Sequence, residues 1–203
     1  MSCMRFLIVY NSFFQRFKKG MIGMSKYILS CDCATHIFGW AIIDKEDFTL
    51  VDYGEIKCDD KDVLYRIDYM VDELQKIIKK YREDIDCSVV EDVPMQFKKN
   101  ITTTVVLAKL NGAVLYLLHK YDIPTQLIYP STWHSKLNIL TSKGNVKKQS
   151  IEWVNKKYGT DFKYYSENSK KNQDNITDPI AMACVVLGNY DRMLKFGRKE
   201  SRI

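Results

Sequence analysis

Residues 27–43 read YILSCDCATHIFGWAII, and the interpretation of the whole chain starts from this stretch. Its first apolar run ends at Asp32, and a second apolar run begins at Phe38 after a short polar interruption. Two such runs predict a buried strand, a tight turn and a second strand that pairs with the first. Asp32 would then lie at the lip of a sheet. That position suits a metal ligand, although strands also often end in Asp to begin a turn.

The rest of the chain alternates between predicted strands and helices. We expect strands at 49–57, 87–93 and 126–129, helices at 63–81, 104–121 and 146–158, and a last helix within 174–194. The helix at 63–81 is the clearest, because its apolar positions recur at spacings of three and four. This order predicts an α/β domain with a mixed sheet, an antiparallel opening meander followed by alternating units.

The connecting segments give three further expectations. Residues 130–145 are predicted to be a loop, and the polar, lysine-rich residues 161–173 a mobile one. Pro179 is tolerated in the first turn of a helix, so we expect the last helix to begin shortly before it.

Length and composition indicate a single domain at 24–194. The chain has 203 residues, of which 46% are hydrophobic, enough for a substantial core. Residues 1–23 are predicted to be an extended or disordered leader, because their basic residues follow the apolar burst, the reverse of a secretory signal. Residues 195–203 form a basic tail.

The sequence also indicates where the protein acts. No apolar run approaches the length of a membrane span, so we expect no membrane partner. The six cysteines include no CxxC pair, which favours reduced thiols and a cytoplasmic protein.

Charge is distributed unevenly along the chain. Residues 44–92 hold 16 acidic against 8 basic residues, a net charge of −8. Residues 93–173 hold 13 lysines against 4 acidic residues, a net charge of +9. The two segments could be solvated surface. They also match what a nuclease needs, a basic track for phosphates beside carboxylates that bind metal.

Four acidic residues fall at the ends of predicted elements: Asp32, Glu91, Asp174 and Asp178. Each alone could begin a turn, end a strand in solvent or cap a helix. If the first and fourth strands are neighbours and the last helix crosses them, however, these carboxylates meet at one edge and repel unless cations neutralise them. Oxygen ligands favour Mg²⁺ or Mn²⁺. Two such ions about 4 Å apart are the usual device for attack of water on a phosphodiester.

The order of these acids resembles that of the RuvC-type Holliday junction resolvases in the RNase H-like superfamily, most of all their phage-encoded members. Three stretches carry the resemblance over roughly residues 26–190: SCDCATHIFGWAII, VVEDVPMQFKKNITTTVVLAKLNGAVLYLL and DNITDPIAMACVV. The resemblance implies a mixed five-stranded RNase H-like sheet flanked by helices. It also implies a metal-dependent endonuclease that resolves four-way DNA junctions by paired symmetric phosphodiester hydrolysis, in the host cytoplasm if the protein is phage-encoded.

The resemblance further implies cofactors and partners. We expect two Mg²⁺ ions per active site, with Mn²⁺ able to substitute, and a homodimer bound to branched DNA. The helix at 104–121 is apolar on more than one face and is the candidate dimer interface, although a core helix of a monomer would look the same.

Site residues follow by position. Asp32, Glu91 and Asp178 match the metal-binding acids of the family. The fourth acid commonly lies three residues before the last, where this chain has Asn175, so Asp174 is the expected fourth ligand and Asn175 the alternative. Lys136 and Lys147 match the basic residues near the scissile phosphate, and the residues expected to bind DNA are Phe97, Lys98, Lys99, Lys143 and Lys148. Each of these lysines could instead be a surface residue, and Phe97 a loop anchor.

Two alternative functions remain open at this point. The first is a nuclease of the same fold that acts on RNA–DNA hybrids or other branched DNA. The second is a non-catalytic junction-binding protein, for which Asn175 is the only support.

Overall fold

The computed structural model describes residues 26–93, 101–139 and 144–188. The predicted leader and basic tail lie outside this range, as do Phe97, Lys98, Lys99 and Lys143.

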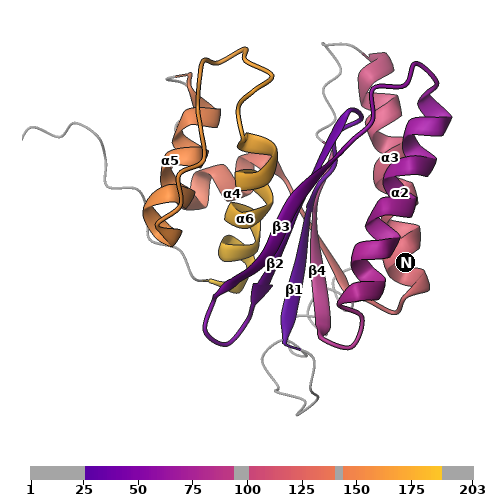
Figure 1. Ribbon diagram of the computed structural model, residues 1–203, viewed down its shortest axis with the longest axis horizontal. Helices are drawn as coiled ribbons and strands as arrows, with labels where there is room; N and C mark the ends of the chain where they lie inside the picture. The colour runs from indigo at the N-terminus through magenta and orange to yellow at the C-terminus, as the bar shows by residue number, and fades with distance from the viewer. Residues whose placement is uncertain (1–25, 94–100, 140–143, 189–203) are drawn as a thin grey trace, which may run out of the picture.

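A mixed five-stranded sheet forms the centre of the molecule, which confirms the predicted fold class (Figure 1). The strand order is β3-β2-β1-β4-β5. Strands β3, β2 and β1 form an antiparallel meander, and β4 and β5 run parallel to β1. The strands are β1 (Tyr27–Asp32), β2 (Ile37–Asp44), β3 (Leu50–Lys57), β4 (Ile85–Glu91) and β5 (Thr125–Ile128).

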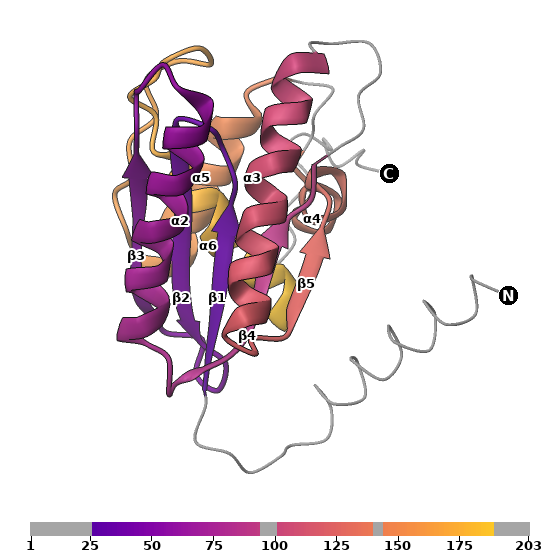
Figure 2. The ribbon, with the colours of Figure 1, turned by 90° about the vertical axis from the view of Figure 1, so that its right-hand side faces the viewer.

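Helices cover both faces of this sheet (Figure 2). The described helices are α2 (Val63–Lys80), α3 (Ile101–Lys120), α4 (Pro130–Leu137), α5 (Val146–Tyr158) and α6 (Asp174–Leu187). Helices α2 and α3 lie on one face and α4, α5 and α6 on the other (Figure 1). Successive side chains of β1 point to opposite faces of the sheet: Ile28 packs in the core on the α6 side, and Leu29 packs in the core on the side of α2 and α3. The sheet is therefore buried on both faces, as the apolar runs predicted.

The prediction of a loop at 130–145 was wrong for its first half, because residues 130–137 form α4. Pro130 occupies the start of this helix, where its fixed backbone angle is favourable. Trp133 and Leu137, four residues apart, share one face and are buried in the core. Tertiary burial of that face stabilises a helix that is too short to be stable in isolation.

The start of α6 also differs from the prediction. The helix begins at Asp174, so Pro179 lies in its second turn rather than its first. A proline there removes the N–H that would bond to the carbonyl four residues earlier, which is that of Asn175. This carbonyl instead lies against Gly39 of β2, where an added Cβ would be 1.7 Å from the Asn175 oxygen. Only glycine permits this approach of α6 to the sheet.

The segment before α6 is held by its own polar side chains and is not the mobile loop that its composition predicted. Asn172 is 4% exposed, accepts a hydrogen bond from the Tyr165 N–H at 2.8 Å and donates to the Ser166 carbonyl at 2.6 Å. The Gln173 side chain accepts from the Lys163 N–H at 2.7 Å. Amide side chains thus supply the backbone partners that a helix or sheet would otherwise give.

Candidate active site

The topology brings all four predicted acids to one end of the sheet. Asp32 is the last residue of β1, and Glu91 is the last residue of β4. Because these two strands are parallel neighbours, their carboxyl ends meet at the same edge. Helix α6 packs across β2 and β1 with its first turn toward that edge, and it carries Asp174 and Asp178 one turn apart.

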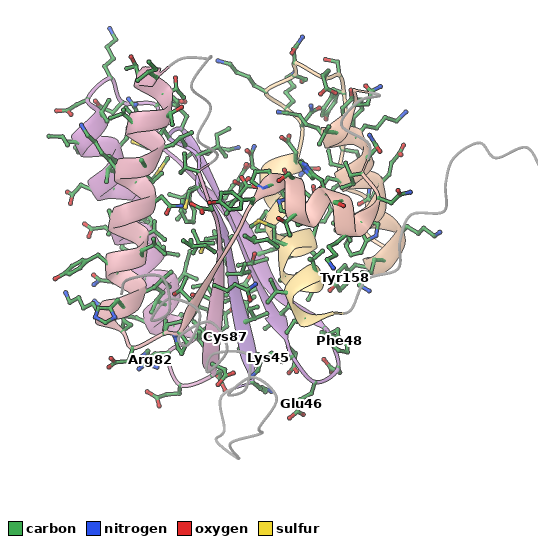
Figure 3. All side chains as sticks on the ribbon, turned by 180° about the vertical axis from the view of Figure 1, so that it is seen from behind. Lys45, Glu46, Phe48, Arg82, Cys87 and Tyr158 are labelled. Carbon is green, nitrogen blue, oxygen red and sulfur yellow. The ribbon has the colours of Figure 1, made fainter. Side chains whose placement is uncertain are left out.

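At the opposite end of the sheet, where Lys45 and Glu46 lie, acidic residues are paired with lysines, Asp86 with Lys45 and Asp44 with Lys26 (Figure 3). The turn between β2 and β3, with Lys45, Glu46 and Phe48, lies there near Arg82. The Tyr158 hydroxyl donates to the Phe48 carbonyl at 3.2 Å and so ties the end of α5 to this turn. The acidic cluster is therefore confined to one end of the fold.

Electrostatics show that the acids at the site interact with one another. The pKa of Asp32 is raised to about 6, chiefly by burial; a hydrogen bond with Glu91 lowers it, and the charge of Asp174 raises it. Burial also raises the pKa of Glu91 well above its ordinary value, and the Asp32 charge adds to that increase. These carboxyl groups are thus buried close to one another, and bound cations would stabilise their ionised forms.

Asp178 behaves in the same way. Burial raises its pKa well above the ordinary value, and the charges of Asp32 and then Asp174 add to that increase. The Ser150 hydroxyl donates a hydrogen bond to the Asp178 carboxylate and acts in the opposite direction. Asp178 on α6 thus belongs to the same electrostatic cluster as the two strand-end acids.

Three of the four carboxylates also have a partner from the surrounding elements. The Trp133 indole N–H donates to Glu91 Oε1 at 2.9 Å. Lys147 Nζ lies 2.9 Å from Asp174 Oδ2, and the Asp174 side chain is only 9% exposed. Partial burial lowers the pKa of Lys147, but its hydrogen bond with Asp174 and the charges of Asp174 and Asp178 together outweigh this effect and raise the pKa.

These partners also orient the carboxylates. Within residues 26–93, 101–139 and 144–188, no three Asp, Glu, His or Cys side chains are already arranged as ligands of one ion. Three of the carboxylates are instead bonded to protein groups, Glu91 to Trp133, Asp178 to Ser150 and Asp174 to Lys147. The donor set itself is four carboxylates, three of which have pKa values raised by burial and by neighbouring acids, and carboxylate oxygens are the hard ligands that divalent cations prefer.

The structure separates the other predicted residues into three groups. Lys147 lies beside the acids, as expected. Lys136 is exposed on the last turn of α4 and is not among the residues that shift the pKa of the buried acids. Lys148 is exposed, 3.7 Å from Glu152 on the same helix. Roles for Lys136, for Lys148 and for the four residues outside the described range stay predictions.

Several residues that organise the site were not predicted. Trp133 and Ser150 hold the carboxylates of Glu91 and Asp178. The buried Arg66 side chain donates to the Thr35 carbonyl at 3.0 Å and to the Asp60 carbonyl, which fixes the turn that follows Asp32. For Trp133 a signal existed, because Pro130 followed by apolar residues four apart is typical of a short buried helix.

Comparison with known proteins agrees with this geometry. A family model described as crossover junction endodeoxyribonuclease RuvC matches residues 28–185. Two curated proteins with the same description are similar to this chain. The one from Fusobacterium nucleatum is 28% identical over 177 residues (86% of this chain and 86% of that protein), and the one from Rickettsia typhi is 30% identical over 141 residues (66% and 85%).

Solved structures show the same fold. RuvC from Thermus thermophilus in complex with a Holliday junction substrate matches with a TM-score of 0.59 over 83% of this chain and 99% of that chain. At 13% sequence identity this similarity concerns the arrangement of the elements alone.

Proposed function

Because the chain belongs to the RuvC family of crossover junction endodeoxyribonucleases, we propose that it cuts four-way DNA junctions by hydrolysing phosphodiester bonds. The observation that carries this proposal is the meeting of β1, β4 and α6 at one end of the sheet, where four acids interact. The curated relatives named above are bacterial, and a phage origin stays a prediction.

The family is one of metal-dependent nucleases, and we propose that this site holds two Mg²⁺ ions, for which Mn²⁺ can substitute. Asp32, Glu91, Asp174 and Asp178 would hold them. Support comes from the raised pKa values of three of these groups: burial is the main cause, neighbouring carboxylates add to it, and bound cations would offset both effects by stabilising the ionised carboxylates. When bound, such ions activate water and stabilise the leaving oxygen of a phosphodiester.

The chain's own residues prepare this chemistry. Trp133 and Ser150 fix the orientation of the Glu91 and Asp178 carboxylates, as hydrogen-bond partners of metal ligands do elsewhere. Lys147 keeps a positive charge beside Asp174, and its side chain is 42% exposed. It is therefore placed to stabilise negative charge on a phosphate bound at the site.

We also propose that the protein acts as a homodimer through α3. Its exposed side includes Ile101 (68% exposed), Val105 (46%) and Tyr116 (70%), which recur at helical spacing along one face. Between them lies Gly112, at which an added Cβ would meet no atom within 4 Å, so a second helix has room to approach. A twofold dimer would present two equivalent sites, as two symmetric cuts require.

By length and composition alone α3 is apolar enough to cross a membrane. Its inner side, with Leu110, Val114 and Leu118, is nevertheless completely buried against the sheet. Because a core helix meets the same criterion, the exposed side is better explained by a protein interface than by lipid.

The test is a cleavage assay on three substrates: a synthetic four-way junction, a flap and an RNA–DNA hybrid, each with and without Mg²⁺. We expect paired symmetric cuts in the junction that require Mg²⁺ or Mn²⁺, and binding that weakens steeply with salt. Cleavage of the hybrid alone would favour a ribonuclease of the same fold. Junction binding without cleavage of any substrate would favour the non-catalytic alternative.

A further inference from the structure

A cavity of about 440 Å³ adjoins the candidate active site. It lies where the start of β2, the start of α5, the loop before α6 and the first turn of α6 come together. Lys147 and Asp174 line it and also belong to the acidic cluster. A DNA strand with its scissile phosphate at the acids would therefore place a neighbouring nucleotide in or beside this cavity.

The lining of the cavity is rich in side-chain amides. Asn168 and Asn175 both contribute, from the loop and from α6, and Ile37 adds an apolar surface. An amide offers a donor and an acceptor together, which is the pattern that matches the edge of a base. The volume lies within the range usual for small-molecule sites, so an unstacked nucleotide fits.

Charge in the cavity favours a base over a phosphate. Its lining holds two acidic residues, Glu167 and Asp174, and two lysines, Lys147 and Lys170, and because Lys147 is already paired with Asp174 the lining has no net positive charge to hold a phosphate. Lys170 also lines it and offers a cation to the sugar–phosphate chain on either side of the base. A neutral base within the cavity avoids repulsion by the acidic residues, and a phosphate near Lys170 pairs with its positive charge.

The loop that forms this cavity is fixed in advance. From the end of the loop tip, the Asn172 side chain bonds to the backbone of Tyr165 and Ser166 at its start, and the backbone N–H of Gln173 donates to the Lys163 carbonyl at 3.2 Å. The loop tip at 166–171 is thereby held relative to the first residue of α6. A binding surface that is already ordered loses less entropy when its ligand binds.

We propose that this cavity is a nucleotide subsite that reads the base next to the cleaved bond. In it Asn168 and Asn175 contact the base edge and Lys170 contacts the phosphate chain. The inference rests on the proposed junction cleavage, and it assigns the choice of cleavage position to the loop at 161–173. Asn172 is a positioning residue in this scheme, because its amide is already bonded to the backbone.

The experiment uses four-way junctions in which the bases around the exchange point are randomised, and the cut sites are mapped by sequencing. We expect the intact protein to prefer certain bases at one position beside the cut. Asn168→Ala should reduce that preference about tenfold, which is the size expected for loss of one base contact, and Asn175→Ala should act in the same direction. The melting temperature of each variant, measured in parallel, shows that it is folded.

Two lysines next to each other in the loop provide a matched pair. Lys170→Gln should slow cleavage of all sequences alike and reduce the salt dependence of junction binding, because a lost phosphate contact carries no sequence information. Lys171→Gln, which changes a lysine outside the cavity lining, should leave both properties as they are.

The possible results separate this inference from the proposed function. Folded Asn168→Ala and Asn175→Ala proteins that keep the full preference would overturn the subsite, and so would an intact protein that cuts without any preference. In both cases junction cleavage itself would stand. Failure of the intact protein to cut any junction would instead overturn the proposed function.

Discussion

The backbone carbonyl of Asn175 faces Gly39 so closely that a single added carbon on Gly39 would lie 1.7 Å from the oxygen. Gly39 is the residue paired with Asp32 across β1 and β2. The contact therefore sets the distance between the α6 acids and the strand-end acid. Pro179 contributes to the same contact, because it cannot offer the N–H that would bond to this carbonyl within the helix.

Replacing Gly39 by Ala should move α6 away from the sheet. Overpacking of this kind costs about 1–3 kcal/mol of stability, and the shift of Asp174 and Asp178 should reduce cleavage more than tenfold. Urea unfolding and the junction assay measure the two effects. A Gly39→Ala protein with wild-type stability and activity would show that the close contact does not position the site.

Removing the charge of a strand-end acid should abolish cleavage without loss of DNA binding. Asp32→Asn and Glu91→Gln each remove a proposed metal ligand, so we expect the cleavage rate to fall by about a thousandfold or more, while junction affinity changes by less than about threefold. Asp86→Asn is the control, because Asp86 is an exposed residue of β4 at the other end of the sheet, paired with Lys45. Normal cutting by Asp32→Asn would show that the site is misplaced.

The fourth ligand can be identified by comparing two adjacent residues of α6. The Asp174 side chain is nearly buried and forms an ion pair with Lys147, whereas the backbone carbonyl of Asn175 lies against Gly39. We therefore expect Asp174→Asn to lose cleavage activity and metal affinity. Asn175→Ala should keep most of its metal affinity and most of its cleavage activity on a junction of preferred sequence. Titration calorimetry with Mn²⁺ measures the affinity. The reverse ranking would assign the ligand role to Asn175.

The indole of Trp133 should matter for activity as well as for packing. Trp133→Phe removes the hydrogen bond to Glu91, and loss of such a partner typically costs about 10–100-fold in activity or metal affinity. Trp153→Phe is a matched control in the same core cluster, and it should lower stability without changing cleavage. Equal activities of the two variants would mean that the Glu91 contact is only structural.

The metal-free protein should become less stable as pH rises through neutrality, because the site acids bind protons more tightly in the folded state than in the unfolded state. The pKa of Asp32 is about 6 in the folded state and about 3.9 in the unfolded state. The contribution of this group to the free energy of unfolding therefore falls as pH rises from about 4 to 6. Glu91 and Asp178, whose pKa values are also raised, extend this loss of stability to higher pH.

His134 acts in the opposite direction, since burial lowers its pKa to about 4 and its protonation costs stability at lower pH. Comparison with Asp32→Asn removes this contribution, because both proteins contain His134. Without metal, the variant should melt higher than the wild type at pH 7.5, by roughly 5 °C, and the gap should narrow at pH 5.5. Mg²⁺ should raise the melting temperature of the wild type more than that of the variant. A gap that is independent of pH would contradict the raised pKa of Asp32.

The sequence by itself determined the elements and the identity of the acids. The apolar runs around Asp32 and Glu91 placed both residues at strand ends, and the spacing in 63–81 defined α2 almost to the residue. These features are readable because alternation and helical periodicity are local properties of the chain. The resemblance to the RuvC-type resolvases rested on the same acids, and the family comparison bears it out.

The tertiary structure alone decided how the acids are held. Helix α4 forms because Trp133 is buried beneath Glu91, the loop at 161–173 is ordered because Asn172 and Gln173 bond to its backbone, and α6 is seated by Gly39. Each of these contacts joins a polar or small group to a partner that local periodicity does not specify. Patterns in the sequence report which face of an element is apolar, but the partner of a buried polar group depends on which segments meet in the folded chain.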